Sequence, residues 1–267
     1  MKTQDFFVSA TRRVLKMLGM NVTTPLMVVD SFYQQVDPKS MLDGATSRVA
    51  KLFYGHQGRL IHKWGHYLDI YDRHLNRFQN IGRPVRVLEI GVYHGGSLQL
   101  WRQFFGPEAV IFGIDINPLC AEIVDPDTCI RVGSQANPAF LKDVVREMGG
   151  IDIVIDDGSH IASHQRKSLE ILFPLLDPHG VYIAEDLHTS YFRGTFEGGL
   201  GRRGTFIEEV KVLIDGIHKP YHQKKLSVPD AYEGVYGLHV YDSLVVIEKG
   251  PVQRSFHTKV GKPSFKT

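Results

Sequence analysis

The chain has 267 residues, of which 43% are hydrophobic and 22% are charged, and its formal net charge is +2. This composition is typical of a globular protein with a sizeable core, and the length favours one large domain with added segments. A net charge so close to zero argues against a nucleic-acid-binding protein that relies on bulk charge.

The first 80 residues are predicted to be mainly helical and loop-like. Phe7, Thr11, Val14, Leu15 and Leu18 follow helical spacing, which predicts an amphipathic helix packed on the main domain or on a partner subunit. The beginning of the chain lacks the apolar segment of a signal peptide. No apolar run approaches the roughly 18 residues of a membrane-spanning helix. We therefore expect a soluble, cytoplasmic protein.

From residue 84 onward, short apolar runs alternate with amphipathic segments. The predicted strands are VRVLEIG (85–91), AVIFGIDI (109–116), IDIVIDD (151–157) and GVYIAED (180–186). The predicted helices are GGSLQLWRQFF (95–105), NPAFLKDVVREMG (137–149) and HQRKSLEILFPLL (164–176). Asn137 is expected to cap the second of these helices, with Pro138 in its first turn. Such alternation predicts βαβ units and a mainly parallel sheet with helices on both faces.

The C-terminal third of the chain has three distinct segments. VYGLHVYDSLVVIEKG (235–250) predicts an antiparallel hairpin around a turn at Asp242 and Ser243. The glycine-rich segment 189–205 is either a plain surface loop or a lid over an active site. Residues 251–267 contain basic but no acidic side chains and are expected to be loosely ordered. The predicted division is a helical cap in residues 1–80, an α/β domain in 81–250 and a basic tail in 251–267.

The first predicted strand leads into a glycine turn, GVYHGGS (91–97), which follows Glu89 closely. Glycines let a backbone turn tightly and approach a ligand. The G-x-G-x-x-G dinucleotide pattern is absent, which argues against an NAD-dependent oxidoreductase. Asp115 ends the second strand, where an acid typically binds ribose hydroxyls. This combination resembles a class I S-adenosylmethionine-dependent methyltransferase.

Two further predicted strands end in acidic pairs, Asp156–Asp157 and Glu185–Asp186. A single acid at a strand end is often just solvated, but two pairs at one sheet edge would repel each other unless something positive lay between them. Mg²⁺ and Mn²⁺ prefer such oxygen ligands. His160, three residues after Asp157, is the candidate general base, and His164 and His188 compete for that role.

Four stretches carry a more specific resemblance. VLEIGVYHGGSLQLW (87–101), IDDGSH (155–160) and EDLHTSY (185–191) together resemble the macrocin O-methyltransferase family, whose members methylate sugar hydroxyls of macrolides and related glycosides. KWGHYLDIYDRHL (63–75) is similar to the segment that closes over the cofactor in this family. The resemblance implies a Rossmann-like class I methyltransferase fold of the α/β class, with a mainly parallel seven-stranded sheet and an antiparallel C-terminal hairpin. Residues 81–250 would then be the catalytic domain.

The resemblance also implies cofactors and residue roles. S-adenosyl-L-methionine and Mg²⁺ (or Mn²⁺) are the expected cofactors, with His160 as the general base. The implied metal ligands are Asp157, Glu185 and Asp186. The implied cofactor-binding residues are Glu89, Gly91, Tyr93, Gly95, Ser97, Asp115, Gln135 and Asp156, joined by Lys63, Tyr67 and Tyr71 from the upstream segment. Asp156 alternatively supports the ligands from behind, and the two tyrosines alternatively pack in the core.

The implied function is S-adenosylmethionine- and metal-dependent O-methylation of a sugar hydroxyl. The acceptor would be a glycoside or polysaccharide, such as a macrolide or a mycobacterial methylated mannose or rhamnose glycan. One alternative is a cation-dependent O-methyltransferase for a catechol or other vicinal diol of a non-sugar natural product. A second alternative is a non-catalytic adenosyl-ligand-binding protein on the same fold. We expect a homo-oligomer without a nucleic-acid partner.

Overall fold

The computed structural model describes residues 36–123, 128–223, 228–251 and 256–264. The helix predicted in residues 7–18 lies outside these ranges. The chain divides into two units, residues 1–44 and 45–267. In the described part of the first unit, α3 (Pro38–Leu42) begins after Asp37, whose side chain accepts a hydrogen bond from the backbone of Lys39. In the second unit, residues 256–264 form neither helix nor strand.

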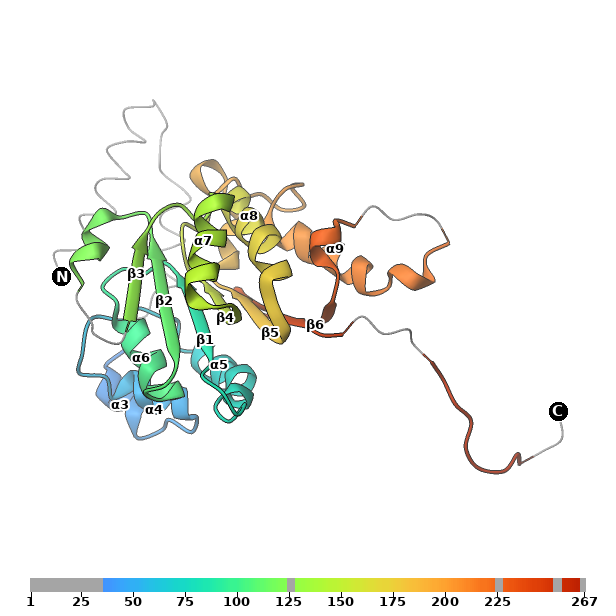
Figure 1. Ribbon diagram of the computed structural model, residues 1–267, viewed down its shortest axis with the longest axis horizontal. Coiled ribbons are helices and arrows are strands. Elements are labelled where there is room, and N and C mark those ends of the chain that lie inside the picture. Colours follow the sequence, from blue (N-terminus) through green and yellow to red (C-terminus); the bar gives the residue numbers. More distant parts are fainter. Residues whose placement is uncertain (1–35, 124–127, 224–227, 252–255, 265–267) are drawn as a thin grey trace. The chain divides into compact units, whose positions relative to one another are not determined.

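The second unit contains a seven-stranded sheet with the order β3-β2-β1-β4-β5-β7-β6 (Figure 1). Strands β1 to β5 run parallel, whereas β7 is antiparallel to both β5 and β6. This arrangement confirms the mainly parallel sheet and the C-terminal hairpin expected from the sequence. The strands are β1 (Arg86–Ile90), β2 (Val110–Asp115), β3 (Thr128–Val132), β4 (Ile151–Asp156), β5 (Leu176–Ala184), β6 (Val235–Tyr241) and β7 (Leu244–Lys249).

Helices cover both faces of this sheet, as predicted. The α-helices of the second unit are α4 (Arg48–Tyr54), α5 (Tyr67–Leu75), α6 (Gly96–Phe105), α7 (Pro138–Met148), α8 (Ala162–Leu172) and α9 (Phe206–Ile217). The 3₁₀ helices are η1 (Asn76–Phe78), η2 (Pro118–Glu122), η3 (Phe173–Leu175), η4 (Leu187–Tyr191), η5 (Gly194–Phe196), η6 (Lys219–Tyr221) and η7 (Asp230–Tyr232). Within the described ranges, none of the helices is long and apolar enough to cross a membrane.

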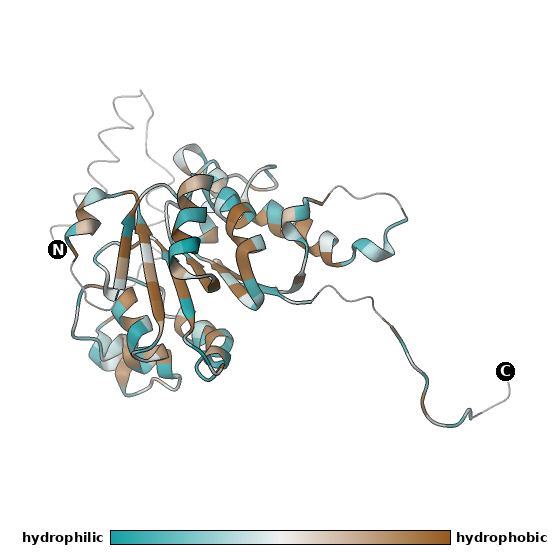
Figure 2. Cartoon of the chain, in the orientation of Figure 1, coloured by the Kyte–Doolittle hydropathy of each residue, from teal (hydrophilic) through white to brown (hydrophobic). Residues whose placement is uncertain are grey.

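Alternate side chains of each strand enter two separate cores, because successive residues of a strand point to opposite faces. Val87, Ile153 and Val246 pack with α4, α5 and α6. Leu88 and Val154 pack with α7, α8 and α9 on the other face. Apolar residues therefore dominate the central strands in Figure 2. The unit begins at Ala45, so α4 and α5 belong to the same body as the sheet. The functional division at residue 80 stays a prediction.

Local signals in the sequence identified most of the boundaries. Asn137 caps α7 by accepting hydrogen bonds from the backbone of Ala139 and Phe140 at 3.0 and 3.3 Å, and Pro138 lies in the first turn. The hairpin turns at Asp242 and Ser243, as predicted. Strand β3 was missed because its residues are only partly buried at the sheet edge, so the short segment lacks a clear apolar run.

An ion-pair cluster links the amino-terminal ends of the parallel strands β1, β4 and β5. Asp152 at the beginning of β4 accepts paired hydrogen bonds from both Arg83 and Arg86, at 2.7–3.0 Å. Arg86 also donates to Asp177 of β5 at 3.0 Å. Burial alone would raise the pKa of Asp152, but the two guanidinium groups outweigh it and lower this pKa to about 2. The carboxylate therefore stays ionised and joins three strands.

We predict that Asp152→Asn lowers the free energy of unfolding by about 2 kcal/mol at neutral pH, because the pKa of Asp152 is about 2 in the folded protein and higher in the unfolded chain. Because the folded-state pKa lies below the unfolded one, this stabilisation is complete above the unfolded pKa of roughly 4. It disappears as the pH falls through about 2. Urea unfolding of both proteins between pH 7 and pH 2 measures the difference. Asp143→Asn, at an exposed carboxylate, is the control, and equal losses in the two variants would contradict the assignment.

Candidate active site

The carboxyl ends of β1, β4 and β5 lie level at one edge of the sheet. Ile90 is paired with Asp156, and Asp156 is paired with Ala184. The two acidic pairs therefore come side by side, as the strand pattern predicted. In an open α/β sheet this is the edge at which ligands bind.

The positive charge between these acids comes from the chain itself, from Lys63. Its ammonium lies 2.6 Å from Asp157 Oδ2, 2.9 Å from Glu185 Oε1 and 3.4 Å from Glu89 Oε1. The Lys63 side chain is 2% exposed. Burial lowers the pKa of Lys63, but the carboxylates of Asp157 and Glu185 raise it well above its usual value. The ammonium group is therefore charged, and three carboxylates share it.

Glu185 and Glu89 are held by further donors. Tyr71 donates a short hydrogen bond to Glu185 Oε1. Burial raises the pKa of Glu185 well above its usual value and repulsion from Asp157 adds to it, while Lys63 and Tyr71 offset only part. Ser97 Oγ and Trp101 Nε1 donate to Glu89 Oε2 at 2.8 and 3.1 Å. Glu89 is completely buried, so its carboxylate contacts this chain's own groups rather than open space.

Asp186 is positioned by the segment that precedes α5 and by α5 itself. Trp64 Nε1 donates to Asp186 Oδ1 at 3.1 Å, and the Tyr67 hydroxyl donates to the same oxygen at 3.0 Å. The Tyr67 hydroxyl also lies 3.0 Å from Ser243 O in the hairpin turn. Sequence reasoning missed Trp64, although the tryptophan stands directly after Lys63 in a segment that was singled out.

His160 lies between Asp157 and Asp186, the two acids that are only partly buried. Its Nε2 is 3.8 Å from Asp157 Oδ1 and 3.7 Å from Asp186 Oδ2. Its Nδ1 is buried, and among the described residues it has no hydrogen-bond partner. Both His160 and Asp186 have left-handed backbones, with φ of 55° and 54°. Such strain in residues other than glycine costs roughly 1–3 kcal/mol each and often marks functional sites.

The two competing histidines have other partners. His164 Nδ1 lies 3.0 Å from Ser159 Oγ. His188 Nδ1 lies 2.6 Å from Ser243 Oγ, and its ring packs edge-on against Trp64. Burial lowers the pKa of His188. Neither ring lies in the cluster formed by Asp157, His160 and Asp186.

Asp156 and Gln135 belong to a buried network behind the site. Asp156 is fully buried and accepts hydrogen bonds from Tyr182 at 2.5 Å, Ser168 at 2.6 Å and Gln135 at 3.0 Å. Gln135 Oε1 in turn accepts from the backbone of Ser159 at 2.8 Å. The network fixes the loop that carries Asp157 and His160, so the geometry agrees with the supporting role for Asp156 that the sequence left as an alternative.

The glycine turn lies where β1 meets β2. Gly91 has φ of +94°, and a Cβ there would lie 2.0 Å from Asp157 O, so no other residue fits. Asp115 accepts backbone hydrogen bonds from Val92 at 2.8 Å and Tyr93 at 3.2 Å. Gly95 has φ of +76° and begins α6. The exposed side chains of Tyr93 and Ile116 leave apolar surface beside the acid.

These features fit the two groups that the resemblance implies. An acid beside exposed apolar side chains suits a nucleoside, which combines ribose hydroxyls with a flat base. Asp157, His160 and Asp186 offer ligand atoms within 4.8 Å of one another, and hard oxygen donors suit Mg²⁺. Glu185 faces Lys63 and Tyr71 instead, so a bound cation would have to share this carboxylate with the ammonium.

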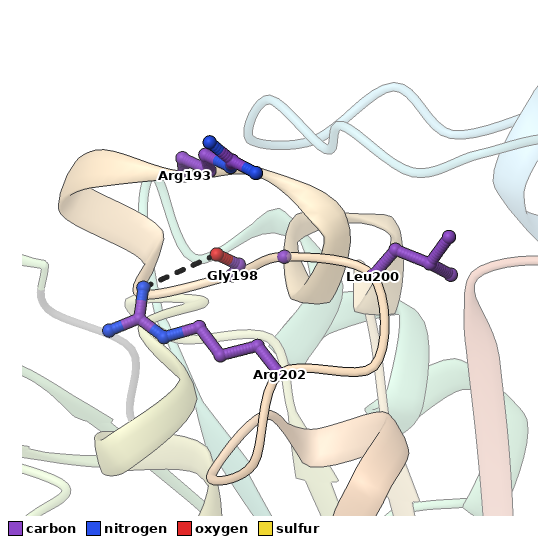
Figure 3. A pocket seen from close by; sticks show the side chains of 5 residues that line it. Arg193, Gly198, Leu200 and Arg202 are labelled. Carbon is purple, nitrogen blue, oxygen red and sulfur yellow. Dashed lines mark hydrogen bonds between the residues drawn. The ribbon is translucent and has the colours of Figure 1, made fainter.

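The glycine-rich segment forms η4, η5 and a loop around a cavity of about 460 Å³. Figure 3 shows Arg193 and Arg202 on two sides of Gly198, whose carbonyl accepts from Arg202 at 3.3 Å. A Cβ at Gly198 would lie 2.4 Å from Phe192 O, which explains the glycine there. Thr189 Oγ1 donates to His160 O at 3.2 Å and so joins this segment to the site.

Comparison with known proteins adds to this geometry. A family model described as a methyltransferase domain matches residues 88–187, which include both acidic pairs. The chain is 36% identical over 242 residues to 8-demethyl-8-(2-methoxy-alpha-L-rhamnosyl)-tetracenomycin-C 3'-O-methyltransferase of Streptomyces olivaceus, covering 85% of this chain and 60% of that protein. It is 37% identical over 240 residues to demethylmacrocin O-methyltransferase of Streptomyces fradiae, covering 83% and 59%. The chain belongs to the macrocin O-methyltransferase-like family.

A solved structure of this family has the same fold. The MycE methyltransferase from the mycinamycin biosynthetic pathway, in complex with Mg and SAH, matches with a TM-score of 0.65 and 33% identity, covering 84% of this chain and 59% of that one. A further crystal of MycE contains Mg, SAH and mycinamycin VI, with a TM-score of 0.63 and 34% identity, covering 81% and 54%. The Rossmann-like class I methyltransferase fold is confirmed. The chain spans about three fifths of the length of the two curated relatives described above.

In this family member, we predict that Lys63→Met lowers the free energy of unfolding by about 3–5 kcal/mol, the range for removing one partner of a buried ion pair. The variant would leave Glu89, Asp157 and Glu185 without their cation. Urea unfolding measures the loss, with Lys142→Met at an exposed position of α7 as the control. A loss below about 1 kcal/mol, the usual value of an exposed pair, would contradict the central place of Lys63.

Proposed function

We propose that this chain is an S-adenosylmethionine- and divalent-metal-dependent O-methyltransferase that acts on a sugar hydroxyl of a glycoside. The carrying observation is the position of His160 between Asp157 and Asp186, beside the glycine turn and Asp115. The names of the relatives support the same class of reaction, since they are O-methyltransferases of glycosylated compounds.

Methyl transfer to a hydroxyl releases one proton, and His160 would take it. The hydroxyl proton would go to Nε2, which lies 3.8 Å from Asp157 Oδ1 and 3.7 Å from Asp186 Oδ2. Nδ1 lies buried without a partner among the described residues, so Nε2 is the nitrogen that faces the acids. The buried network around Asp156 holds the loop that carries Asp157 and His160. A base held in a fixed position reaches the reactive geometry more readily.

The chain's own residues would hold both cofactors. Asp157 and Asp186 would bind the cation, with Glu185 as a third ligand shared with Lys63. A divalent cation would supply positive charge where the acceptor hydroxyl loses its proton. The adenosyl part of S-adenosylmethionine would be held by Gly91, Tyr93, Gly95 and Asp115. Lys63 and the buried Glu89 would determine the charge beneath it.

The acceptor would lie over His160 and under the glycine-rich segment 189–205. Leu200 is 89% exposed and Arg193 is also exposed, so this loop offers apolar and cationic groups to a glycoside. Closure of the segment would exclude water from the methyl donor. The homo-oligomer and the cytoplasmic location expected from the sequence stay predictions.

We predict that the purified protein transfers labelled methyl from S-adenosylmethionine to rhamnosides or related deoxysugar glycosides. EDTA should abolish the transfer and Mg²⁺ should restore it, because the cation would supply positive charge where the acceptor hydroxyl loses its proton. Scintillation counting over a panel of glycosides and catechols measures both points. Transfer that EDTA leaves unchanged would contradict the metal site, and transfer to catechols alone would contradict the sugar acceptor.

We further predict that His160→Gln lowers kcat by about 10²–10⁴-fold, the usual contribution of a positioned general base. The affinity for S-adenosylmethionine should stay unchanged, because Gln is similar in size to His and His160 is not among the residues proposed to hold the adenosyl part. Single-turnover kinetics and titration calorimetry measure the two quantities. His164→Gln is the matched control, and an equal loss in that variant would move the base to His164.

A further inference from the structure

A second group of ligand-type side chains lies outside the candidate active site. His74 in the last turn of α5, His239 on β6 and Glu248 on β7 each place one ligand atom within 4.8 Å of the others. His74 Nδ1 is 3.8 Å from Glu248 Oε1, and His239 Nε2 is 3.5 Å from Glu248 Oε2. The two imidazole rings lie with their centroids 4.5 Å apart.

The register of the hairpin brings two of these residues to one face. His239 pairs with Val246 and Gly237 pairs with Glu248, so His239 and Glu248 are diagonal neighbours on the face that α5 covers. Gly237 makes room for the carboxylate, because a Cβ there would lie 3.2 Å from Glu248 Oε2. His74 reaches the pair from α5.

His74 has the burial and the hydrogen bond at its second ring nitrogen that are usual for metal-binding histidines. Its side chain is 5% exposed, and its Nε2 shares a 2.9 Å hydrogen bond with the Tyr241 hydroxyl. Burial lowers the pKa of His74 to about 4, with His239 adding to the effect and Glu248 opposing it. The imidazole is therefore neutral at physiological pH. A neutral ring whose second nitrogen is fixed by a hydrogen bond presents its free lone pair to a metal.

The site is accessible from outside. Glu248 lines a cavity of about 250 Å³ together with Arg77, His179, Tyr236 and Lys249. The Glu248 side chain is 19% exposed and that of His239 is 41% exposed. Arg77 Nη2 lies 3.5 Å from Glu248 Oε1 and neutralises part of its charge in the absence of a metal. An ion could enter through this cavity, and one coordination position of the bound ion would stay open toward the cavity.

The geometry points to a binding site for Zn²⁺ with His74 Nδ1, His239 Nε2 and one Glu248 oxygen as ligands. A tetrahedron with metal–ligand bonds of about 2.0–2.1 Å has edges of about 3.4 Å. His74 Nδ1 lies 3.8 Å from Glu248 Oε1 and His239 Nε2 lies 3.5 Å from Glu248 Oε2, and one ligand atom of each residue lies within 4.8 Å of the others, so small side-chain rotations would bring two nitrogens and one oxygen to this spacing. Two imidazoles and one carboxylate favour zinc over magnesium, which prefers oxygen ligands throughout. This inference does not depend on the proposed methyltransferase activity.

The test is Zn²⁺ binding to the EDTA-stripped full chain, measured by competition with a chromophoric chelator. We expect a Zn²⁺ site in the wild type whose affinity falls by more than about 100-fold in His239→Ala and in Glu248→Gln, since even outer contacts contribute 10–100-fold. Co²⁺ in the wild type should give the intense visible bands of tetrahedral coordination, and these should vanish in both variants. His222→Ala removes one exposed histidine elsewhere and should bind Zn²⁺ like the wild type.

Two further measurements keep the result specific. The double variant Asp157→Asn with Asp186→Asn alters the candidate active site and should keep the Zn²⁺ affinity. Loss of Zn²⁺ binding in this double variant, with retention in His239→Ala, would overturn the inference. Equal affinity in the wild type, His239→Ala and Glu248→Gln would overturn it as well. Circular dichroism of each variant establishes folding, and His239→Gln replaces His239→Ala if the smaller side chain unfolds the hairpin.

Discussion

The candidate site depends on one constraint, the burial of carboxylates around a single ammonium group. Removing charged groups from water costs several kcal/mol per ion unless they are paired and hydrogen-bonded. Lys63 satisfies this requirement for Glu89, Asp157 and Glu185 at once. Because Lys63 lies upstream of the sheet, the segment before α5 must lie over the carboxyl edge for the acids to be buried. The segment before α5 and the acidic site that it covers therefore form together.

The same constraint explains the strained backbones at this edge. Asp186, the second member of its acidic pair, and His160, three residues after Asp157, both adopt left-handed conformations. The chain must leave the strand at once so that Asp157 and Asp186 turn toward His160, while Asp156 and Glu185 stay buried. The buried members hold hydrogen bonds behind the edge, and Asp157 and Asp186 stay partly exposed beside His160. Each acidic pair is thus divided into one structural and one accessible carboxylate.

The sequence predicted what local patterns determine. Apolar runs located β1, β2, β4 and β5, and Asn137 located the beginning of α7. Acids at strand ends located the site, since parallel strands must end at one edge. The place of Lys63 could not be predicted in this way, because its partners lie up to 122 residues away in the chain. Trp64, in the segment before α5, and His74, on α5, were missed for the same reason: a single polar atom in the sequence gives no sign of a partner that lies far away in the chain.

Helix α5 joins the two groups of polar side chains described here. Tyr67, Tyr71 and His74 follow the i, i+4, i+7 spacing of one helix face. Tyr67 and Tyr71 bind Asp186 and Glu185, whereas His74 faces His239 and Glu248. The β6–β7 hairpin contacts α5 at both places: Ser243 O lies 3.0 Å from the Tyr67 hydroxyl, and the Tyr241 hydroxyl is hydrogen-bonded to His74. Since a helix moves as a rigid rod, a displacement of α5 along the hairpin would alter both groups, and an ion that ties His74 to β6 and β7 would also fix the tyrosines that orient the acids.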